Sequence, residues 1–155
     1  IFRRAVLNFK FHNCGAYAEL LSHEMVRSIK DVYRDRKFDL VTCVPMHKDT
    51  LRERGYNQAE LLAKECARLL GIEYADLLVK TKKNKTQHSI KAAERAKNVI
   101  GVYSPIDKNL IKGKRILIID DIITTGSTLG ECARILNKCK CGEICCCTLC
   151  TSLLI

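Results

Sequence analysis

Residues 116–128 read ILIIDDIITTGST, and this stretch decides the expected fold. Four apolar residues predict a buried strand, which ends in the carboxylates of Asp120 and Asp121. A hydroxyl-rich loop then enters a helix expected over residues 127–138, and Gly126 allows a tight turn. Hydroxyls and free backbone amides at a helix start favour a phosphate dianion, whereas paired carboxylates suit sugar hydroxyls and a divalent cation. Together they are typical of a site for a ribose 5-phosphate.

The pattern along the rest of the chain indicates an α/β fold. Apolar residues at helical spacing predict a helix over residues 16–33, and Asn57 with Glu60 resembles a capping box that opens a helix ending at Gly71. A further short helix is expected near residues 90–97, and strands are expected at 40–44, 77–79, 99–103, 116–119 and 144–149. Apolar strands that alternate with helices predict a central, mostly parallel β-sheet flanked by helices. Ligands of such sheets bind beyond the carboxyl ends of the strands, here after Val44, Val79 and Ile119.

Composition and charge narrow the class of partner. The 155 residues suit a single domain, with no internal repeat, and the net charge is +10, from 27 Lys and Arg against 17 Asp and Glu. This excess favours a phosphorylated small molecule or nucleic acid, unless the basic surface has no specific partner. No apolar run approaches the roughly 20 residues that span a bilayer, and no secretory signal is visible, so we expect a cytoplasmic protein without membrane contact. A first residue of Ile1 rather than Met is compatible with a fragment.

Ten cysteines are many for this length, and we expect them to be reduced thiols. Six of them fall late, at Cys139, Cys141, Cys145, Cys146, Cys147 and Cys150. Metal binding is one interpretation. Successive residues of a strand point to opposite faces, however, so three adjacent thiols could not all turn to one metal ion. We therefore favour a buried strand that uses cysteine as a small apolar residue.

Longer stretches resemble a known family. Residues 116–128 match the phosphoribosyl-pyrophosphate motif of type I phosphoribosyltransferases. The segments VPMHKDTLRERGYNQAELLA (44–63), TQHSIKAAERAKNVIGVY (86–103) and FRRAVLNFKFHNCGAYAELL (2–21) resemble the ComF/GntX (competence protein F) family within that superfamily. The resemblance implies a single domain, residues 1–155, with a small hood or helix over about 1–38 and a core over 39–155. The zinc-ribbon-like segment that many members carry ahead of this domain is absent from the sequence, and the late cysteines should not be taken for it.

The resemblance also implies roles for particular residues. The catalytic pair, Asp120 and Asp121, would hold the ribose hydroxyls and Mg²⁺. The ligand-binding loop would comprise Ile122, Ile123, Thr124, Thr125, Gly126, Ser127 and Thr128. The loop facing pyrophosphate would comprise Pro45, Met46, His47 and Lys48, with Arg54 as a further phosphate ligand. A flexible loop over residues 80–89 would close over the site with Lys82, Lys83, Lys85 and Gln87.

Two functions of different classes follow from these expectations. The first is a transferase that binds 5-phosphoribosyl-1-pyrophosphate with Mg²⁺ and passes the phosphoribosyl group to an unknown base or amine. The alternative is a non-catalytic module in competence and DNA uptake that binds a nucleotide, a phosphoribosyl ligand or single-stranded DNA, with DNA-uptake proteins as further partners. The lysines of the loop over residues 80–89 suit contact with DNA. Aromatic residues are only 6% and Trp is absent, however, so few side chains could stack on bases. The sequence does not identify the acceptor or show whether turnover occurs. It also leaves the oligomeric state open, with a homodimer as one option.

Overall fold

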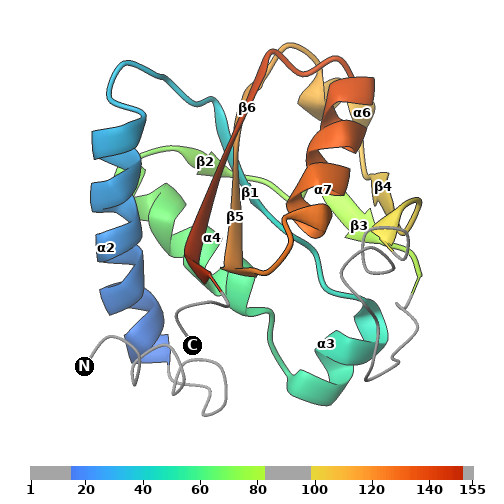
Figure 1. The fold of residues 1–155 in the computed structure, drawn as a ribbon, viewed down its shortest axis with the longest axis horizontal. Coiled ribbons are helices and arrows are strands. Elements are labelled where there is room, and N and C mark those ends of the chain that lie inside the picture. The colour runs from blue at the N-terminus through green and yellow to red at the C-terminus, as the bar shows by residue number, and fades with distance from the viewer. Residues whose placement is uncertain (1–14, 83–98, 152–155) are drawn as a thin grey trace.

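The computed structural model describes residues 15–82 and 99–151 (Figure 1). Its elements run in the order α2 (Gly15–Val32), β1 (Leu40–Cys43), α3 (Lys48–Arg54), α4 (Gln58–Leu70), β2 (Glu73–Tyr74), β3 (Leu78–Lys80), β4 (Tyr103–Pro105), α6 (Lys108–Ile111), β5 (Arg115–Ile123), α7 (Ser127–Lys138) and β6 (Glu143–Thr151). The helix expected near residues 90–97 lies outside the described residues. No helix within the described ranges combines the length and the apolarity that crossing a membrane requires.

The centre of the fold is a four-stranded sheet in the order β2-β1-β5-β6, and every neighbouring pair is parallel. Strand β5 lies between β1 and β6, with Ile116 opposite Leu40 on one side and Ile144 on the other. Residues 116–119 are fully buried because helices cover both faces of the sheet. The predicted α/β fold with a mostly parallel central sheet is therefore confirmed.

Side chains alternate between two apolar layers. Val41 and Leu117 point toward α2 and α4, which cover one face of the sheet. Leu40 and Ile118 point toward α7, β3, β4 and α6 on the other face. Figure 1 shows α2 and α4 on one side of the strands and α7 on the other. Both faces of the sheet are thus closed, and the functional surface is left at the ends of the strands.

Two predicted strands do not join the parallel sheet. β3 and β4 form a separate antiparallel pair, with Val79 opposite Ser104. The second of them begins at Tyr103, where the strand predicted over 99–103 was expected to end. Short apolar runs indicate a strand but carry no information about its partner, so only tertiary packing decides this pairing. The helices α3 and α6 were not predicted from the sequence.

Four of the six late cysteines, Cys145, Cys146, Cys147 and Cys150, pack as apolar residues of the edge strand β6. Cys145 and Cys147 belong to the layer beneath α2 and α4, whereas Cys146 belongs to the layer beneath α7. Burial raises the pKa of both Cys146 and Cys147 to about 11, so these thiols stay protonated at neutral pH. Within the described ranges, no cluster of three His, Cys, Asp or Glu side chains could hold a metal ion. The alternation across the strand agrees with a packing role.

Candidate functional site

A cavity of about 300 Å³ opens at the carboxyl ends of β1 and β5, as expected for a parallel sheet. Figure 1 shows the ends of β5 and β6 and the start of α7 at the same edge of the molecule. The walls of the cavity come from the segment after β1, from α3 and α4, from β3 and β4, and from β5 and α7. The lining residues are, in that order, Val44, Pro45, Met46 and His47; Thr50 and Arg54; Asn57 and Gln58; Lys80 and Tyr103; and Asp120, Asp121, Ile122 and Thr128. Both acidic residues therefore face the cavity.

The two carboxylates belong to the last part of β5 rather than following it. The strand continues to Ile123, and Asp120 lies opposite Thr148 of β6. The backbone N–H of Asp121 donates to Oδ1 of Asp120 at 2.9 Å, and the N–H of Ile122 donates to Oδ1 of Asp121 at 2.8 Å. Burial, and then the charge of Asp121, raises the pKa of Asp120 to about 8. The pair is thus held in place and attracts positive charge.

The hydroxyl-rich loop forms a smaller adjoining cavity of about 50 Å³, lined by Asp120 and residues 122–129. Gly126 has φ 76°, in the left-handed region that favours glycine, and as the N-cap of α7 it offers no side chain to the first amides of the helix. The N–H of Ser127 donates to Oγ1 of Thr125 at 3.4 Å. Ser127 and Thr125 share a hydroxyl–hydroxyl hydrogen bond of 2.7 Å. Uncapped amides, hydroxyls and the positive end of the helix dipole give this loop the chemistry of a phosphate site.

The predicted pyrophosphate loop is brought to the cavity in part. Pro45, Met46, His47 and Arg54 line it, whereas Lys48 is exposed at the first residue of α3 and is not among its lining residues. Nδ1 of His47 accepts a hydrogen bond of 3.3 Å from the N–H of Asp49 and so caps α3. A neutral His47 must then carry its proton on Nε2, which can donate to a ligand oxygen.

Asn57 connects α4 to the end of β1. Its Oδ1 accepts a hydrogen bond of 3.1 Å from the N–H of Ala59, which confirms the predicted cap, and its Nδ2 donates to the carbonyl of Val44 at 3.1 Å. Glu60 pairs instead with Lys64 at 2.6 Å. Asn57 therefore positions the cavity wall after β1.

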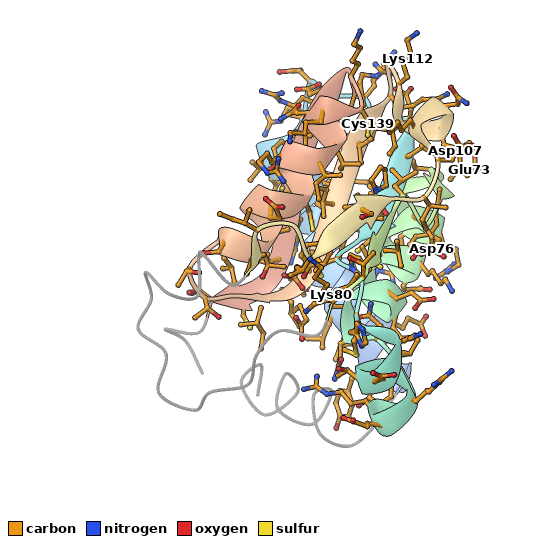
Figure 2. All side chains as sticks on the ribbon, turned by 90° about the vertical axis from the view of Figure 1, so that its right-hand side faces the viewer. Glu73, Asp76, Lys80, Asp107, Lys112 and Cys139 are labelled. Carbon is orange, nitrogen blue, oxygen red and sulfur yellow. The ribbon has the colours of Figure 1, made fainter. Side chains whose placement is uncertain are left out.

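Tyr103 was not predicted as a lining residue, and Lys80 was predicted only as the first residue of the flexible loop over residues 80–89. They are register partners in the β3–β4 pair, and Nζ of Lys80 lies 5.6 Å from the centroid of the Tyr103 ring. Burial lowers the pKa of Lys80, and the nearby charge of Asp120 opposes this shift. Figure 2 shows Lys80 at a distance from Lys112, toward the end of the sheet that carries the cavity. The sequence showed Lys80 only as the first of several basic loop residues, so nothing local marked its partner.

The remaining predicted residues fall into three groups. Ile123, Thr124, Thr125, Gly126 and Ser127 line only the smaller cavity. Lys82 is exposed and lines neither cavity. Lys83, Lys85 and Gln87 lie outside the described residues, so their role as a closing loop stays a prediction.

The comparisons with known proteins agree with this geometry. A family model described as a phosphoribosyl transferase domain matches residues 57–153, more than half of the chain. The chain therefore belongs to the phosphoribosyltransferase family.

Its relatives support the narrower resemblance to competence proteins. The chain is similar to competence protein F of Haemophilus influenzae, with 33% identity over 90% of this chain and 63% of the relative. It is similar to competence protein ComFC of Bacillus subtilis, with 32% identity over 92% of this chain and 56% of the relative. It is also similar to DNA utilization protein YhgH of Escherichia coli, with 28% identity over 83% of this chain and 58% of the relative. The chain thus spans 56–63% of the length of these three relatives.

Solved structures show the same fold at lower identity. An adenine phosphoribosyltransferase of Saccharomyces cerevisiae aligns with a TM-score of 0.55 and 15% identity, covering 94% of this chain and 73% of that one. A glutamine phosphoribosylpyrophosphate amidotransferase of B. subtilis aligns with a TM-score of 0.55 and 21% identity, and the alignment covers 83% of this chain and 25% of that one. These likenesses confirm the type I phosphoribosyltransferase fold.

Proposed function

We propose that the chain binds 5-phosphoribosyl-1-pyrophosphate at the cavity beyond β1 and β5 and transfers its phosphoribosyl group to a base or amine. The observation that carries this proposal is one continuous site with two chemistries. Adjacent half-buried carboxylates, Asp120 and Asp121, line the larger cavity, and the uncapped start of α7 lines the smaller cavity next to it. The carboxylates suit a diol, and the helix start suits a 5-phosphate.

The same donor set fits Mg²⁺. Burial disfavours the ionised form of Asp120, so this carboxylate and its neighbour Asp121 would gain from a divalent cation between them. Because Mg²⁺ commonly takes one or two carboxylates and completes its shell with water and substrate phosphates, Asp120 and Asp121 are enough protein ligands. A bound Mg²⁺ would help to neutralise the leaving pyrophosphate.

The residues of the chain supply positioning and charge for the transfer. The bond between the anomeric carbon and the pyrophosphate oxygen breaks, its electron pair leaves with pyrophosphate, and the acceptor nitrogen forms the new bond and then loses its proton. Positive charge develops on the sugar ring, and the carboxylates of Asp120 and Asp121 favour it. Arg54, Lys80 and the Nε2 proton of His47 can stabilise the departing pyrophosphate, because all three side chains line the cavity.

Calorimetric titration with phosphoribosyl pyrophosphate, with and without Mg²⁺, tests the binding step. The protein should bind saturably, and Asp120→Asn/Asp121→Asn should abolish binding while the variant stays folded. The matched control is Glu19→Gln/Asp31→Asn, which makes the same change of charge at exposed positions of α2. Failure of the unmutated protein to bind, or equal loss in both variants, would refute the site. Pyrophosphate release across a panel of bases and amines then tests turnover.

A binding module for DNA or a nucleotide is the second candidate function. The net charge of +10 and the names of the relatives, competence and DNA utilization proteins, favour it. Binding of single-stranded DNA that weakens steeply with salt, without pyrophosphate release for any acceptor, would support this function over the transferase.

A further inference from the structure

A second cavity, of about 460 Å³, lies at the opposite end of the sheet from the carboxylates. The end of α2, the turn before β1, the end of α4 and the first residue of β5 form its walls. Its lining residues are Ile29, Lys30, Tyr33, Arg34, Arg36, Lys37, Phe38, Leu70, Ile72 and Arg115. We call it the basic cavity, because half of these residues are basic and no carboxylate is among these described lining residues.

Charge in the basic cavity is not fully compensated. Arg36 pairs with Glu143, and Arg115 forms bonds of 2.6 and 3.0 Å with Asp39. In the part of the chain that the structure describes, no hydrogen bond or ion pair engages the side chains of the other three basic residues, Lys30, Arg34 and Lys37. The ends of α2 and α4 contribute roughly half a negative charge each, so about two positive charges remain among the lining residues; the exposed carboxylates Asp31 and Asp35 of the same segment do not line the cavity. This excess suits an anion.

Apolar and aromatic side chains form the floor of the basic cavity. The rings of Tyr33 and Phe38 meet edge to face, with centroids 5.8 Å apart and an interplanar angle of 87°. The hydroxyl of Tyr33 donates to the carbonyl of Cys146 at 2.8 Å, which holds the ring in place. Leu70 and Ile72 are half-buried beside them. The floor is therefore formed in advance and suits a flat, apolar group.

The wall of the basic cavity that Arg115 forms is also held in place. The N–H of Asp39 donates to the carbonyl of Arg115 at 2.8 Å, and the N–H of Arg115 donates back to Oδ2 of Asp39 at 2.8 Å. The Arg115 guanidinium holds the pKa of Asp39 well below its usual range, so this pair stays ionised at neutral pH. The turn between α2 and β1 is thus anchored to the first residue of β5, and the cavity needs little ordering to accept a ligand.

We propose that the basic cavity is a second binding site, for a phosphorylated nucleoside. The base would lie on Tyr33 and Phe38, and the phosphate would contact the uncompensated cations Arg34 and Lys37. A cavity of about 460 Å³ is within the range of small-molecule sites. A free mononucleotide and one nucleotide of a single DNA strand share this chemistry. This site is independent of the proposed transferase function, because no residue lines both cavities.

Amide NMR of the whole chain tests the proposal, because it reports the two cavities separately. The isotope-labelled protein is titrated with AMP, with a short thymidine oligonucleotide and with inorganic phosphate. We expect AMP or the oligonucleotide to shift the amides of residues 30–38 and 70–72, and the ligand that shifts them identifies the source. Phosphate alone should shift them far less, because it cannot contact the aromatic floor.

Two charge-matched variants complete the test. Arg34→Ala/Lys37→Ala removes two exposed cations of the basic cavity, and Lys108→Ala/Lys112→Ala removes two exposed cations from the first residue and the C-cap of α6. The first should weaken binding roughly tenfold, and the second should leave it nearly unchanged. Equal weakening in both variants would overturn the proposal, since it would show unspecific attraction. So would shifts confined to residues 120–129, no shifts with either nucleotide probe, or an equal response to phosphate alone.

Discussion

Replacement of Asp120 by Asn should stabilise the ligand-free protein in a pH-dependent manner. Burial, and then the charge of Asp121, raises the pKa of Asp120 from an ordinary 3.8 to about 8. Between these two values the folded chain keeps a proton that the unfolded chain releases. The stability that this carboxyl contributes is therefore fully present below its ordinary pKa and is lost as the pH rises toward 8.

The size of the effect follows from the pKa difference. One unit corresponds to about 1.4 kcal/mol, so the full difference would amount to about 6 kcal/mol, but solvent reaches part of this half-buried carboxyl and reduces that figure. We expect a net loss of about 2–4 kcal/mol between low and high pH. Asn stays neutral and keeps an oxygen that can accept the N–H of Asp121, so the 2.9 Å hydrogen bond survives. For a chain of this length, the melting temperature of the variant should rise by about 5–10 °C at about pH 9.

Thermal unfolding followed by circular dichroism measures this difference. The unmutated chain, Asp120→Asn and the exposed control Asp31→Asn are compared at about pH 4 and about pH 9. The advantage of Asp120→Asn should be large at the higher pH and small at the lower, and the control should show neither. An equal advantage at both pH values, or none at about pH 9, would refute the assignment of a buried, disfavoured carboxylate.

Three further predictions concern single positions. Lys80→Met should weaken the binding of phosphoribosyl pyrophosphate roughly tenfold in calorimetry, because it removes a cation from the cavity, while Lys82→Met at an exposed position should not. Gly126→Ala should lower the free energy of unfolding in urea by about 1–2 kcal/mol, because φ 76° is unfavourable for alanine. The added Cβ would not clash, since it would lie 3.7 Å from the nearest atom of Ile123, and an unchanged urea midpoint would contradict this prediction. Asp39→Asn should lower the melting temperature at neutral pH, because the lowered pKa of Asp39 contributes stability while the carboxyl is ionised; the difference should start to shrink as the pH falls through 3.8 and should disappear only near the lowered pKa of the folded state.

Local signals predicted several elements closely. The helix predicted over 127–138 has these bounds in the structure, and Asn57 caps α4 while Gly71 ends it in the left-handed conformation. The run over 116–119 is fully buried. Each of these features depends on a few consecutive residues whose backbone preferences or apolar spacing act at short range.

The sequence was less informative where partners lie far apart along the chain. It indicated strands near 77–79 and 99–103 but placed them in the parallel sheet, whereas they pair with each other in antiparallel fashion. The helix α3 escaped notice because its seven residues include none that is buried, and so they show no apolar stripe. Lys48 was expected to face pyrophosphate, but the first turn of α3 leaves it exposed.

The sequence by itself determined the acidic pair, the uncapped glycine-initiated helix that follows it and the apolar strand that carries both, because these neighbours are joined covalently. Only the tertiary structure decided that Lys80 and Tyr103 come to Asp120, and that Lys30, Arg34 and Lys37 surround Tyr33 and Phe38 at the other end of the sheet. Burial of apolar side chains drives those encounters, and this force has no direction of its own. Which polar groups meet therefore depends on how all the layers pack together.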